Sequence, residues 1–357
     1  MFYDTKYSGI NPFVRCGNPT FSRGVLRQGF VVHLTMVNIS ILALKNAVAA
    51  SIADTEYVFS IVNDLLKRSG KPALFKVRLV GLSGEVKLSN GRFFLKPDVL
   101  IDEVHQTDLI IIPSMTGDAV GATYLNKDYA PWILEQYKNG AEVASLCVGA
   151  FLLAYSGLLK EKQCTTHWAY ANEFRYYYPD VKLAAEKVMT HQNGLYSSGG
   201  NNAYWNLLLY LVEKYTTREI AIHTAKFFVI DLERRDQSPF IIFSGQKKHE
   251  DEPIHKAQEF IEQHYTGKLT VDQIADSFNI TRRTFERRFK KATGNTVVEY
   301  IQRVKIEATK KQLEIGRKPI NEVMYDIGYT DVKTFRDVFK KITGMTPNDY
   351  RNKYNKD

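Results

Sequence analysis

The chain is poor in cysteine and has no long apolar stretch. Its 357 residues include only three cysteines, Cys16, Cys147 and Cys164. These are too few and too scattered for a disulfide framework, so we expect a reducing, cytoplasmic setting. No uncharged run approaches the roughly 20 apolar residues of a membrane-spanning helix, so we expect no membrane partner. Hydrophobic residues make up 44% and charged residues 24%, which excludes a wholly disordered chain, a collagen-like chain and a coiled-coil rod.

Nucleotide-binding and metal-binding motifs are also missing. The sequence contains neither G-x-x-x-x-G-K-[ST] nor a G-x-G-x-x-G after a strand, and these are the loops that cradle phosphates. His105 and His191 have no metal-ligand spacing with any cysteine or carboxylate. The sequence therefore predicts no cofactor and no metal site.

What the chain does have is an uneven excess of positive charge. The net charge is +9, from 48 basic and 39 acidic residues. Residues 251–357 hold 21 Lys and Arg against 16 Asp and Glu, a net of +5, and residues 1–35 contribute a further +3. The stretch between them is nearly neutral. A basic balance favours a polyanion partner, and its place in the chain indicates the C-terminal third.

The pattern of apolar residues divides the chain into four segments. Residues 1–35 carry six glycines and prolines without sustained periodicity, so we expect a disordered extension there. In residues 36–238, short apolar strands alternate with helices, which predicts an α/β domain with a parallel sheet. Residues 239–253 read as a linker in which the apolar run 240–243 docks on a neighbouring domain, and residues 254–357 read as all helical.

The α/β segment allows its elements to be placed. The sequence predicts strands at 37–44, 75–82, 108–113 and 142–147, and a hairpin over 188–198 with its turn at Gln192-Asn193-Gly194. It predicts helices at 53–68, 126–139, 149–158, 168–178, 202–216 and 218–234.

An internal repeat is the strongest signal in the sequence. Residues 284–300 and 334–350 align without a gap at an offset of 50, and nine of 17 positions are identical. Chance agreement at this level is very rare, so the chain contains two copies of one structural unit.

Each copy has the pattern of a helix-turn-helix unit. In the first, Thr270 can form a capping box with Gln273, and Thr281 can cap a second helix. In the second, Gly328 stands where a tight turn is needed, and either Thr330 or Asp331 can cap the following helix. Residues 297–313 between the copies read as one linking helix.

The exposed face of each second helix decides what the units can bind. Six of the ten residues 282–291 are basic and one is acidic. Such a helix can lie in a major groove, where Arg reads guanine and Glu accepts from cytosine. The alternative is that this charged face is only solvated, as on many helical bundles. The duplication of the whole unit favours DNA binding over this alternative. The residues predicted to face DNA are Arg282, Arg283, Glu286 and Arg287, and in the second copy Lys333, Thr334, Arg336 and Asp337.

Residues 254–355 resemble the DNA-binding domain of AraC/XylS-type regulators. The resemblance rests on the stretch that runs from Gly328-Tyr329 through Phe335 and Phe339 to Thr-Pro347 and Arg351. It implies that the first recognition helix makes the more specific base contacts. Met324 departs from the family, which usually has Ala there, and this larger side chain would widen the helix crossing in the second unit.

Cys147 stands at the end of a predicted strand, just before a helix. A strand, a cysteine and a helix with small neighbours such as Gly149 form the pattern of a nucleophile elbow. The helix N-terminus is expected to lower the pKa of the thiol. The alternative is a cysteine that merely fills the core.

The runs 145–168 and 196–200 resemble the flavodoxin-like, class I glutamine amidotransferase-like (ThiJ/PfpI-type) domain that is found fused to AraC-type regulators. His167 would be the catalytic base by this resemblance. However, Val148 stands where peptidase-like relatives have His, Asp54-Thr55 replaces their Gly-Pro, and Asn206 replaces a later Asp. The catalytic site is therefore expected to be degenerate, with Cys147 and His167 as vestigial candidates.

The carboxyl edge of the sheet remains a candidate ligand site, because open α/β sheets bind ligands there. Gly117, Cys147 and Gly199 should converge at this edge. We therefore expect a sequence-specific transcription regulator that binds double-stranded promoter DNA and either responds to a small molecule or dimerises through its catalytically degenerate amidase-like domain. We expect a homodimer and no enzyme activity. Two alternatives stay open: a cysteine-dependent amidase or hydrolase-like enzyme with an accessory DNA-binding domain, and an architectural dimer without a ligand.

Overall fold

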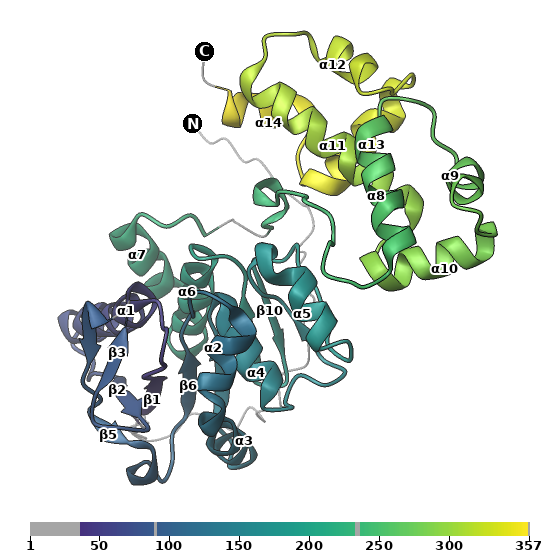
Figure 1. The fold of residues 1–357 in the computed structure, drawn as a ribbon. Helices are drawn as coiled ribbons and strands as arrows, with labels where there is room; N and C mark the ends of the chain where they lie inside the picture. The colour runs from purple at the N-terminus through teal and green to yellow at the C-terminus, as the bar shows by residue number, and fades with distance from the viewer. Residues whose placement is uncertain (1–35, 89–90, 233–235, 356–357) are drawn as a thin grey trace, which may run out of the picture. The chain divides into compact units, whose positions relative to one another are not determined.

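The computed structural model describes residues 36–88, 91–232 and 236–355. The extension expected at residues 1–35 lies outside this range. The described chain begins with an α/β part and ends with an all-helical part (Figure 1), as the sequence predicts. Each part is described by itself.

The α/β part is built on a seven-stranded sheet in the order β10-β11-β7-β6-β1-β2-β5. Its strands are parallel except for β10, which pairs antiparallel with β11. The central strands are buried on both faces, which explains why their sequences are almost continuously apolar. The strands are β1 (Val37–Leu42), β2 (Phe75–Gly81), β5 (Val99–Leu100), β6 (Leu109–Ile112), β7 (Glu142–Ser145), β10 (Met189–Gln192) and β11 (Leu195–Ser198).

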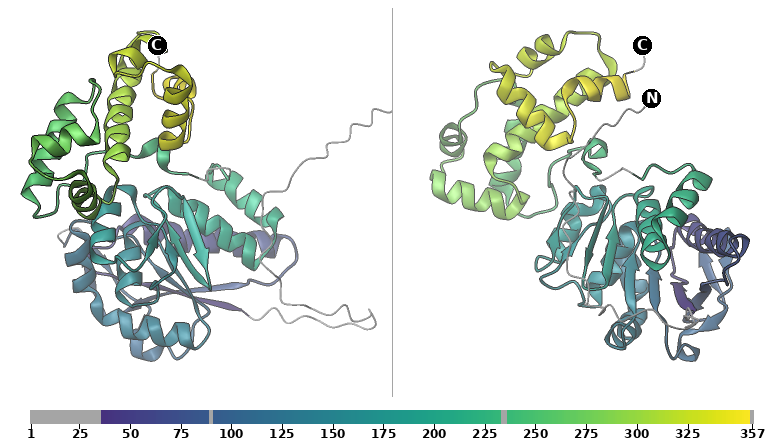
Figure 2. Two further views of the ribbon diagram at one scale, coloured as in Figure 1. Left: turned by 90° about the vertical axis from the view of Figure 1, so that its right-hand side faces the viewer. Right: turned by 180° about the vertical axis from the view of Figure 1, so that it is seen from behind.

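Helices cover both faces of this sheet (Figure 2). One group, whose members contact one another, consists of α1 (Ala49–Arg68), α6 (Ala203–Tyr215) and α7 (Arg218–Phe228). The other consists of α2 (Ala119–Leu125), α3 (Ala130–Lys138), α4 (Ala150–Tyr155) and α5 (Ala171–Tyr177). This is the doubly covered sheet that the alternation of strands and helices predicts.

The four predicted strands and the hairpin are confirmed, and several details differ. Asn193 and Gly194 both have positive φ, at 52° and 71°, as a type I′ hairpin turn requires. Helix α7 ends at Phe228, where the prediction extended it to residue 234, because Val229 adopts the left-handed conformation with φ 56°. Helix α1 begins four residues before the prediction.

Several short elements were not predicted from the sequence. They are α2 and two small two-stranded sheets, β3 (Val86–Leu88) with β4 (Phe93–Leu95) and β8 (Gln163–Cys164) with β9 (Lys182–Leu183). Strands of two or three residues are too short to show a period.

The C-terminal part contains two helix-turn-helix units joined by a long helix, α11 (Val297–Ile315). The first unit is formed by α9 (Val271–Ser277) and α10 (Arg282–Thr293), and the second by α12 (Ile320–Asp326) and α13 (Val332–Thr343). Helix α8 (Glu252–His264) precedes the first unit and α14 (Pro347–Tyr354) follows the second. Both predicted units and the linking helix are confirmed.

Each unit has its own apolar core, and α11 contributes to both. Phe285 and Phe289 of α10 are fully buried against Tyr300 of α11. In the second core, Phe335 and Phe339 of α13 pack with Tyr350 of α14. The aromatic pairs that define the repeat are therefore the inward faces of the two recognition helices. Burying such rings is worth several kcal/mol each, on the order of 3–5 when truncated to Ala.

The helix caps and turns agree with the sequence in most respects. The Thr270–Gln273 capping box is present, and the choice left open in the second unit falls on Asp331, whose carboxylate accepts from the Thr334 N–H at 2.7 Å. Thr281 is the N-cap residue of α10, but its hydroxyl donates to the Thr284 hydroxyl instead of receiving a backbone N–H.

The segment before α8 lies along the helical part. The ring of Phe243 meets that of Tyr300 edge-on with centroids 5.2 Å apart, and the Phe243 N–H donates to the Glu307 carboxylate at 3.0 Å. This agrees with the expected docking of the apolar run 240–243. Within the described residues, no helix has the length and apolar character that a membrane crossing would require.

Candidate nucleic-acid interface and elbow site

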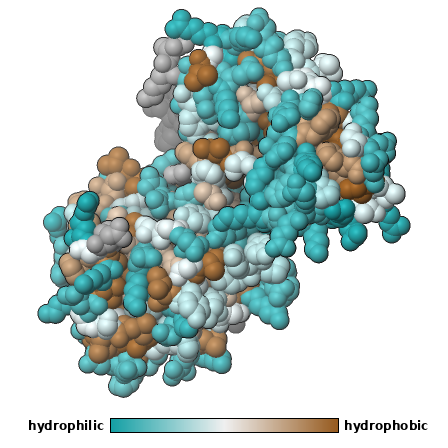
Figure 3. All heavy atoms as spheres, viewed as in Figure 1, coloured by the Kyte–Doolittle hydropathy of each residue, from teal (hydrophilic) through white to brown (hydrophobic). Residues whose placement is uncertain are grey.

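Helix α10 separates its apolar and charged residues onto opposite faces. While Phe285 and Phe289 point into the core, Arg283, Glu286 and Arg287 are exposed. These three, with Lys290, line one wall of a groove of about 400 Å³. Hydrophilic side chains also dominate the face of this helix that is seen in Figure 3. A helix with this division can insert its charged face into a major groove.

Arg282, the remaining predicted contact on α10, is held by two carboxylates. Its Nη1 lies 2.9 Å from Oδ2 of Asp272 on α9, and its Nε lies 3.3 Å from Oε1 of Glu286. In contrast, neither Arg283 nor Arg287 forms an ion pair with any residue in the described part of the chain. In the protein alone, carboxylates therefore hold the guanidinium of Arg282, whereas the guanidinium groups of Arg283 and Arg287 have no carboxylate partner among the described residues.

Arg288 of α10 pairs with a residue of the segment before α8, and the sequence did not predict this structural role. Its guanidinium forms a forked pair with Asp251, with Nε and Nη2 at 2.9 and 2.6 Å from the two carboxylate oxygens. Asp251 also accepts from the Ile254 N–H at the start of α8, and the guanidinium beside it lowers the pKa of this carboxyl. Only the period of the helix, which places residue 288 off the exposed face, could have indicated this.

The second recognition helix offers a smaller charged face. Lys333, Thr334, Arg336 and Asp337 are all exposed on α13, as the sequence predicts. Thr334 and the capping Asp331 line a groove of about 360 Å³ between the two units.

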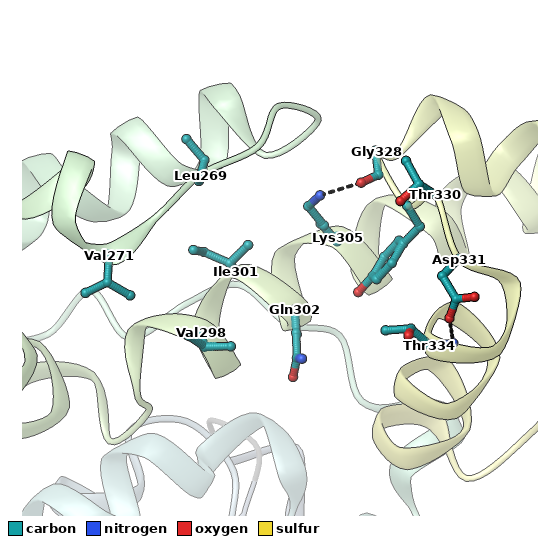
Figure 4. A pocket seen from close by; sticks show the side chains of 11 residues that line it. Leu269, Val271, Val298, Ile301, Gln302, Lys305, Gly328, Thr330, Asp331 and Thr334 are labelled. Atoms are coloured by element: carbon teal, nitrogen blue, oxygen red, sulfur yellow. Dashed lines mark hydrogen bonds between the residues drawn. The ribbon is translucent and has the colours of Figure 1, made fainter.

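This second groove lies next to the first, because Val271 and Val298 line both. Figure 4 shows its apolar side chains, and the hydrogen bond of 3.1 Å that the Lys305 ammonium donates to the Gly328 carbonyl. Burial lowers the pKa of Lys305. The two grooves therefore adjoin, and one is lined by residues of α10 while the other is lined by the start of α13.

In the α/β part, Cys147 occupies the strained elbow that the sequence predicts. It follows β7 with φ 55°, a left-handed conformation that is uncommon outside glycine. Its N–H donates to the Ser198 hydroxyl at 3.2 Å, and its carbonyl accepts from the Thr166 hydroxyl at 3.0 Å. Gly149 is required next to it, because a Cβ there would press on the Ile112 and Pro113 carbonyls.

The predicted activation of this thiol is wrong. Burial raises the pKa of Cys147 to about 11, partly offset by the Ser114 hydroxyl and the Val148 N–H. The side chain is almost fully buried, and only a three-residue 3-10 turn and a six-residue helix follow it. The desolvation of a thiolate outweighs the attraction of so short a helix.

His167 is not arranged as a base for this thiol. Its Nδ1 accepts from the Ala169 N–H at 3.1 Å, and burial lowers the pKa of the ring, so the neutral imidazole carries its proton on Nε2. Neither nitrogen then has a free lone pair for the thiol. The Cys147 Sγ instead lies 3.5 Å from Oδ1 of Asn201.

The carboxylate of Asp54 is paired with a tyrosine. Asp54 of α1 accepts from the Tyr204 hydroxyl at 2.5 Å. Among the described residues, no group of three or more His, Cys, Asp or Glu side chains could hold a metal ion.

The two glycines predicted for the ligand site have different surroundings. Gly117 has open space beside its Cα, and its carbonyl accepts from the Tyr170 hydroxyl at 3.2 Å. Beside Gly199, the buried carboxamide of Gln237 fills the space that a side chain would take. Gln237 donates to the Ala185 carbonyl at 2.7 Å and accepts from the Gly200 N–H at 3.0 Å.

The sequence did not predict the buried role of Gln237, because the residues around it have the composition of a boundary between domains. No pattern around it signals burial. The space beside Gly199 is therefore already filled, whereas the space beside Gly117 is open.

Two families match the chain. Residues 274–353 match a helix-turn-helix domain family, and residues 47–214 match the DJ-1/PfpI family. A solved DJ-1-type structure, a ThiJ/PfpI family protein from Pseudomonas syringae, is 14% identical and covers 72% of this chain and 98% of its own, with a TM-score of 0.47.

Among curated relatives and solved structures, a match to one curated relative is long enough to span both parts. The HTH-type transcriptional regulator GbdR of Pseudomonas aeruginosa is 22% identical over 88% of this chain and 84% of its own length. The HTH-type transcriptional regulator ArgR of the same species is 24% identical over 60% of this chain and 65% of its own. An AraC family transcriptional regulator from Pseudomonas putida, known as a crystal structure, is 17% identical and covers 54% of this chain and 99% of its own, with a TM-score of 0.42.

Proposed function

We propose that this chain, in which a DJ-1/PfpI domain precedes an AraC-type helix-turn-helix domain, regulates transcription by binding promoter DNA in a sequence-specific manner. The observation that supports this most is the pair of helix-turn-helix units, in which α10 and α13 each bury two phenylalanines and expose a charged face. A regulator of promoters acts where the DNA is, so in a bacterial setting the protein works in the cytoplasm.

Each recognition helix enters one of two successive major grooves, whose centres lie about 34 Å apart along the duplex. In the first, Arg283 and Arg287 bind guanine and Glu286 accepts from cytosine. In the second, Lys333, Thr334, Arg336 and Asp337 face the DNA. Lysines and arginines also bind phosphates, which gives an affinity that falls with rising salt.

Selection from a random pool of duplex DNA with the full chain tests this function. We expect enrichment of one motif, and a dissociation constant for the selected duplex at least about 10³-fold below that for a scrambled duplex at physiological salt. A chain that enriches no motif would contradict the proposal.

The DJ-1/PfpI domain serves as a homodimerisation and sensor domain and not as an enzyme. Two observations support the absence of enzyme activity: the raised pKa of the Cys147 thiol keeps it neutral, and His167 has no free lone pair to accept its proton. A Cys147→Ala variant should bind the selected duplex as the wild type does, and neither protein should turn over amide or aldehyde substrates. Turnover that is lost in Cys147→Ala would favour the amidase alternative.

Thiol labelling gives a second test with a defined pH dependence. With a pKa of about 11, only about one Cys147 in 10⁴ is a thiolate at pH 7. Labelling by iodoacetamide, located by mass spectrometry, should be slow at pH 7 and rise about tenfold per pH unit as long as the fold persists. The urea-unfolded chain is the control, and rapid labelling of the folded chain at pH 7 would contradict the assignment.

The effector site lies at the carboxyl edge of the sheet, near Gly117, Cys147 and Tyr170. A screen of metabolites by thermal shift should find a compound that stabilises the wild type and loses its effect in Gly117→Asn, whose side chain would enter the open space and tolerates the left-handed φ of 82°. If no metabolite shifts the melting temperature, the architectural-dimer alternative holds instead.

A further inference from the structure

Arg282 differs from the other arginines of α10 in being bound on two sides. Its guanidinium contacts Asp272 at 2.9 Å and Glu286 at 3.3 Å. Asp272 is the second residue of α9, and Glu286 lies one turn farther along α10. The ion pair with Asp272 therefore connects the two helices of the first unit on the surface that faces DNA.

The second unit has no such pair. When the starts of α9 and α12 are aligned, Asn321 takes the place of Asp272; when those of α10 and α13 are aligned, Val332 takes the place of Arg282. Both members of the pair are absent from the second copy, so the repeated fold does not require it.

Stability does not explain the pair either. The side chains of Arg282, Asp272 and Glu286 are 55%, 59% and 47% exposed, and ion pairs at such positions contribute about 0–1 kcal/mol. Arg282 stands at the first turn of a recognition helix, where DNA phosphates compete for any free guanidinium. A phosphate contact there adds affinity without regard to sequence.

We propose that Asp272 is a positioning residue that holds Arg282 away from DNA phosphates and thereby increases discrimination between specific and non-specific DNA. This inference rests on the proposed function. When Glu286 turns to accept from a cytosine, Asp272 keeps Arg282 in place, so the base contact is made without releasing an arginine to the backbone. Asp272 also places a negative charge where a wrongly docked phosphate would lie.

The test compares the binding of full-length Asp272→Asn to the selected duplex and to its scrambled form, over a range of salt concentrations. We expect the affinity for scrambled DNA to rise about three- to tenfold and that for the selected duplex to change less, so the ratio of the two falls. The slope of log K against log salt for scrambled DNA should steepen by about one. Asp272→Glu should restore the wild-type ratio.

Two controls separate this role from a general effect of charge. Asp276 is exposed on the same helix and has no ion pair among the residues that the structure describes, so Asp276→Asn makes the same change in net charge without touching Arg282. In an Arg282→Gln background, Asp272→Asn should have no further effect, because the restrained side chain is gone.

The outcomes distinguish the inference from the function beneath it. If wild-type protein discriminates between the two duplexes but Asp272→Asn leaves the ratio unchanged, or acts equally in the Arg282→Gln background, the inference is overturned and the function stands. If Asp276→Asn reproduces the effect, the inference is also overturned, since charge alone would account for it. A wild type without sequence preference would overturn the proposed function, and this inference with it.

Discussion

The two helix-turn-helix units have the same core and different surfaces. Both recognition helices bury a pair of phenylalanines four residues apart, and in both copies an aromatic ring from α11 or α14 packs on the second of them. On the outside, residues 282–291 carry six basic side chains, whereas the matching residues 332–341 carry four. The buried faces of the two copies are therefore alike, whereas the exposed faces, which we propose bind DNA, differ in charge.

The turns have diverged as well. The first unit turns at Asn279 with φ 52°, and the second at Gly328 with φ 82°. A Cβ on Gly328 would collide with the backbone carbonyl of Thr266, whereas Asn tolerates the left-handed region. The second turn therefore has room only for glycine, whereas the first turn accommodates asparagine.

The largest expected difference between the units is in DNA affinity. Arg283→Ala and Arg287→Ala should each weaken binding of the selected duplex by about 1–3 kcal/mol, which for the two together is about 30-fold to on the order of 10⁴-fold. Lys333→Ala and Arg336→Ala should cost less, because we assign the more specific base contacts to α10. Fluorescence anisotropy at fixed salt measures both pairs.

The control for loss of charge is Lys311→Ala. Lys311 is a basic residue that is exposed on α11 and lines neither groove. Equal losses of DNA affinity in the α10 and α13 variants, or a larger loss in the α13 variants, would contradict the proposed difference between the two units.

The next effect concerns the turns and is measured as stability. Gly328→Ala should destabilise the helical part by about 2–4 kcal/mol, since a left-handed Ala and a backbone collision are added. Asn279→Gly should stay within about 0.5 kcal/mol of the wild type. Urea unfolding of the full chain, followed by circular dichroism, compares them, and a Gly328→Ala chain as stable as the wild type would contradict the steric argument.

The smallest effect comes from the caps, and it depends on pH. The Thr334 side chain and N–H lower the pKa of Asp331, so its stabilisation is complete above the unfolded pKa of about 3.9 and is lost as the pH falls through the lower folded value. Asp331→Ala should therefore lower the melting temperature at pH 7 but not at the acid end. Thr281→Ala, whose hydroxyl caps no backbone N–H, should show a smaller change without that dependence; the reverse order would contradict the assignment.

Much of this comparison could be predicted from the sequence, because it depends on local signals. The capping box at Thr270 and the glycine at 328 lie within a few residues of the helix start and the turn that they specify. The repeat is visible by direct comparison of two stretches of sequence. Parallel strands such as β6 and β7 were predictable for the same reason, since a strand that is buried on both faces is apolar throughout.

The parts that could not be predicted depend on contacts between distant residues. The pKa of Cys147 was predicted in the wrong direction, because the local helix was visible in the sequence and the burial was not. The forked pair of Arg288 with Asp251 spans 37 residues, and Gln237 reaches back 37 residues to Gly200. The pair of Arg282 with Asp272 joins two helices across a turn, and only the structure shows that it exists.

Interference by guanine methylation on the selected duplex tests the central claim most directly, because N7 of guanine lies in the major groove. Binding of the full chain should be blocked at two clusters of guanines, centred about 10 base pairs apart on one face of the duplex. The Arg283→Ala/Arg287→Ala chain, used at a concentration that restores binding, should lose only one cluster. A single cluster in the wild type, or two clusters that the double substitution leaves unchanged, would contradict the assignment of two recognition helices to two successive major grooves.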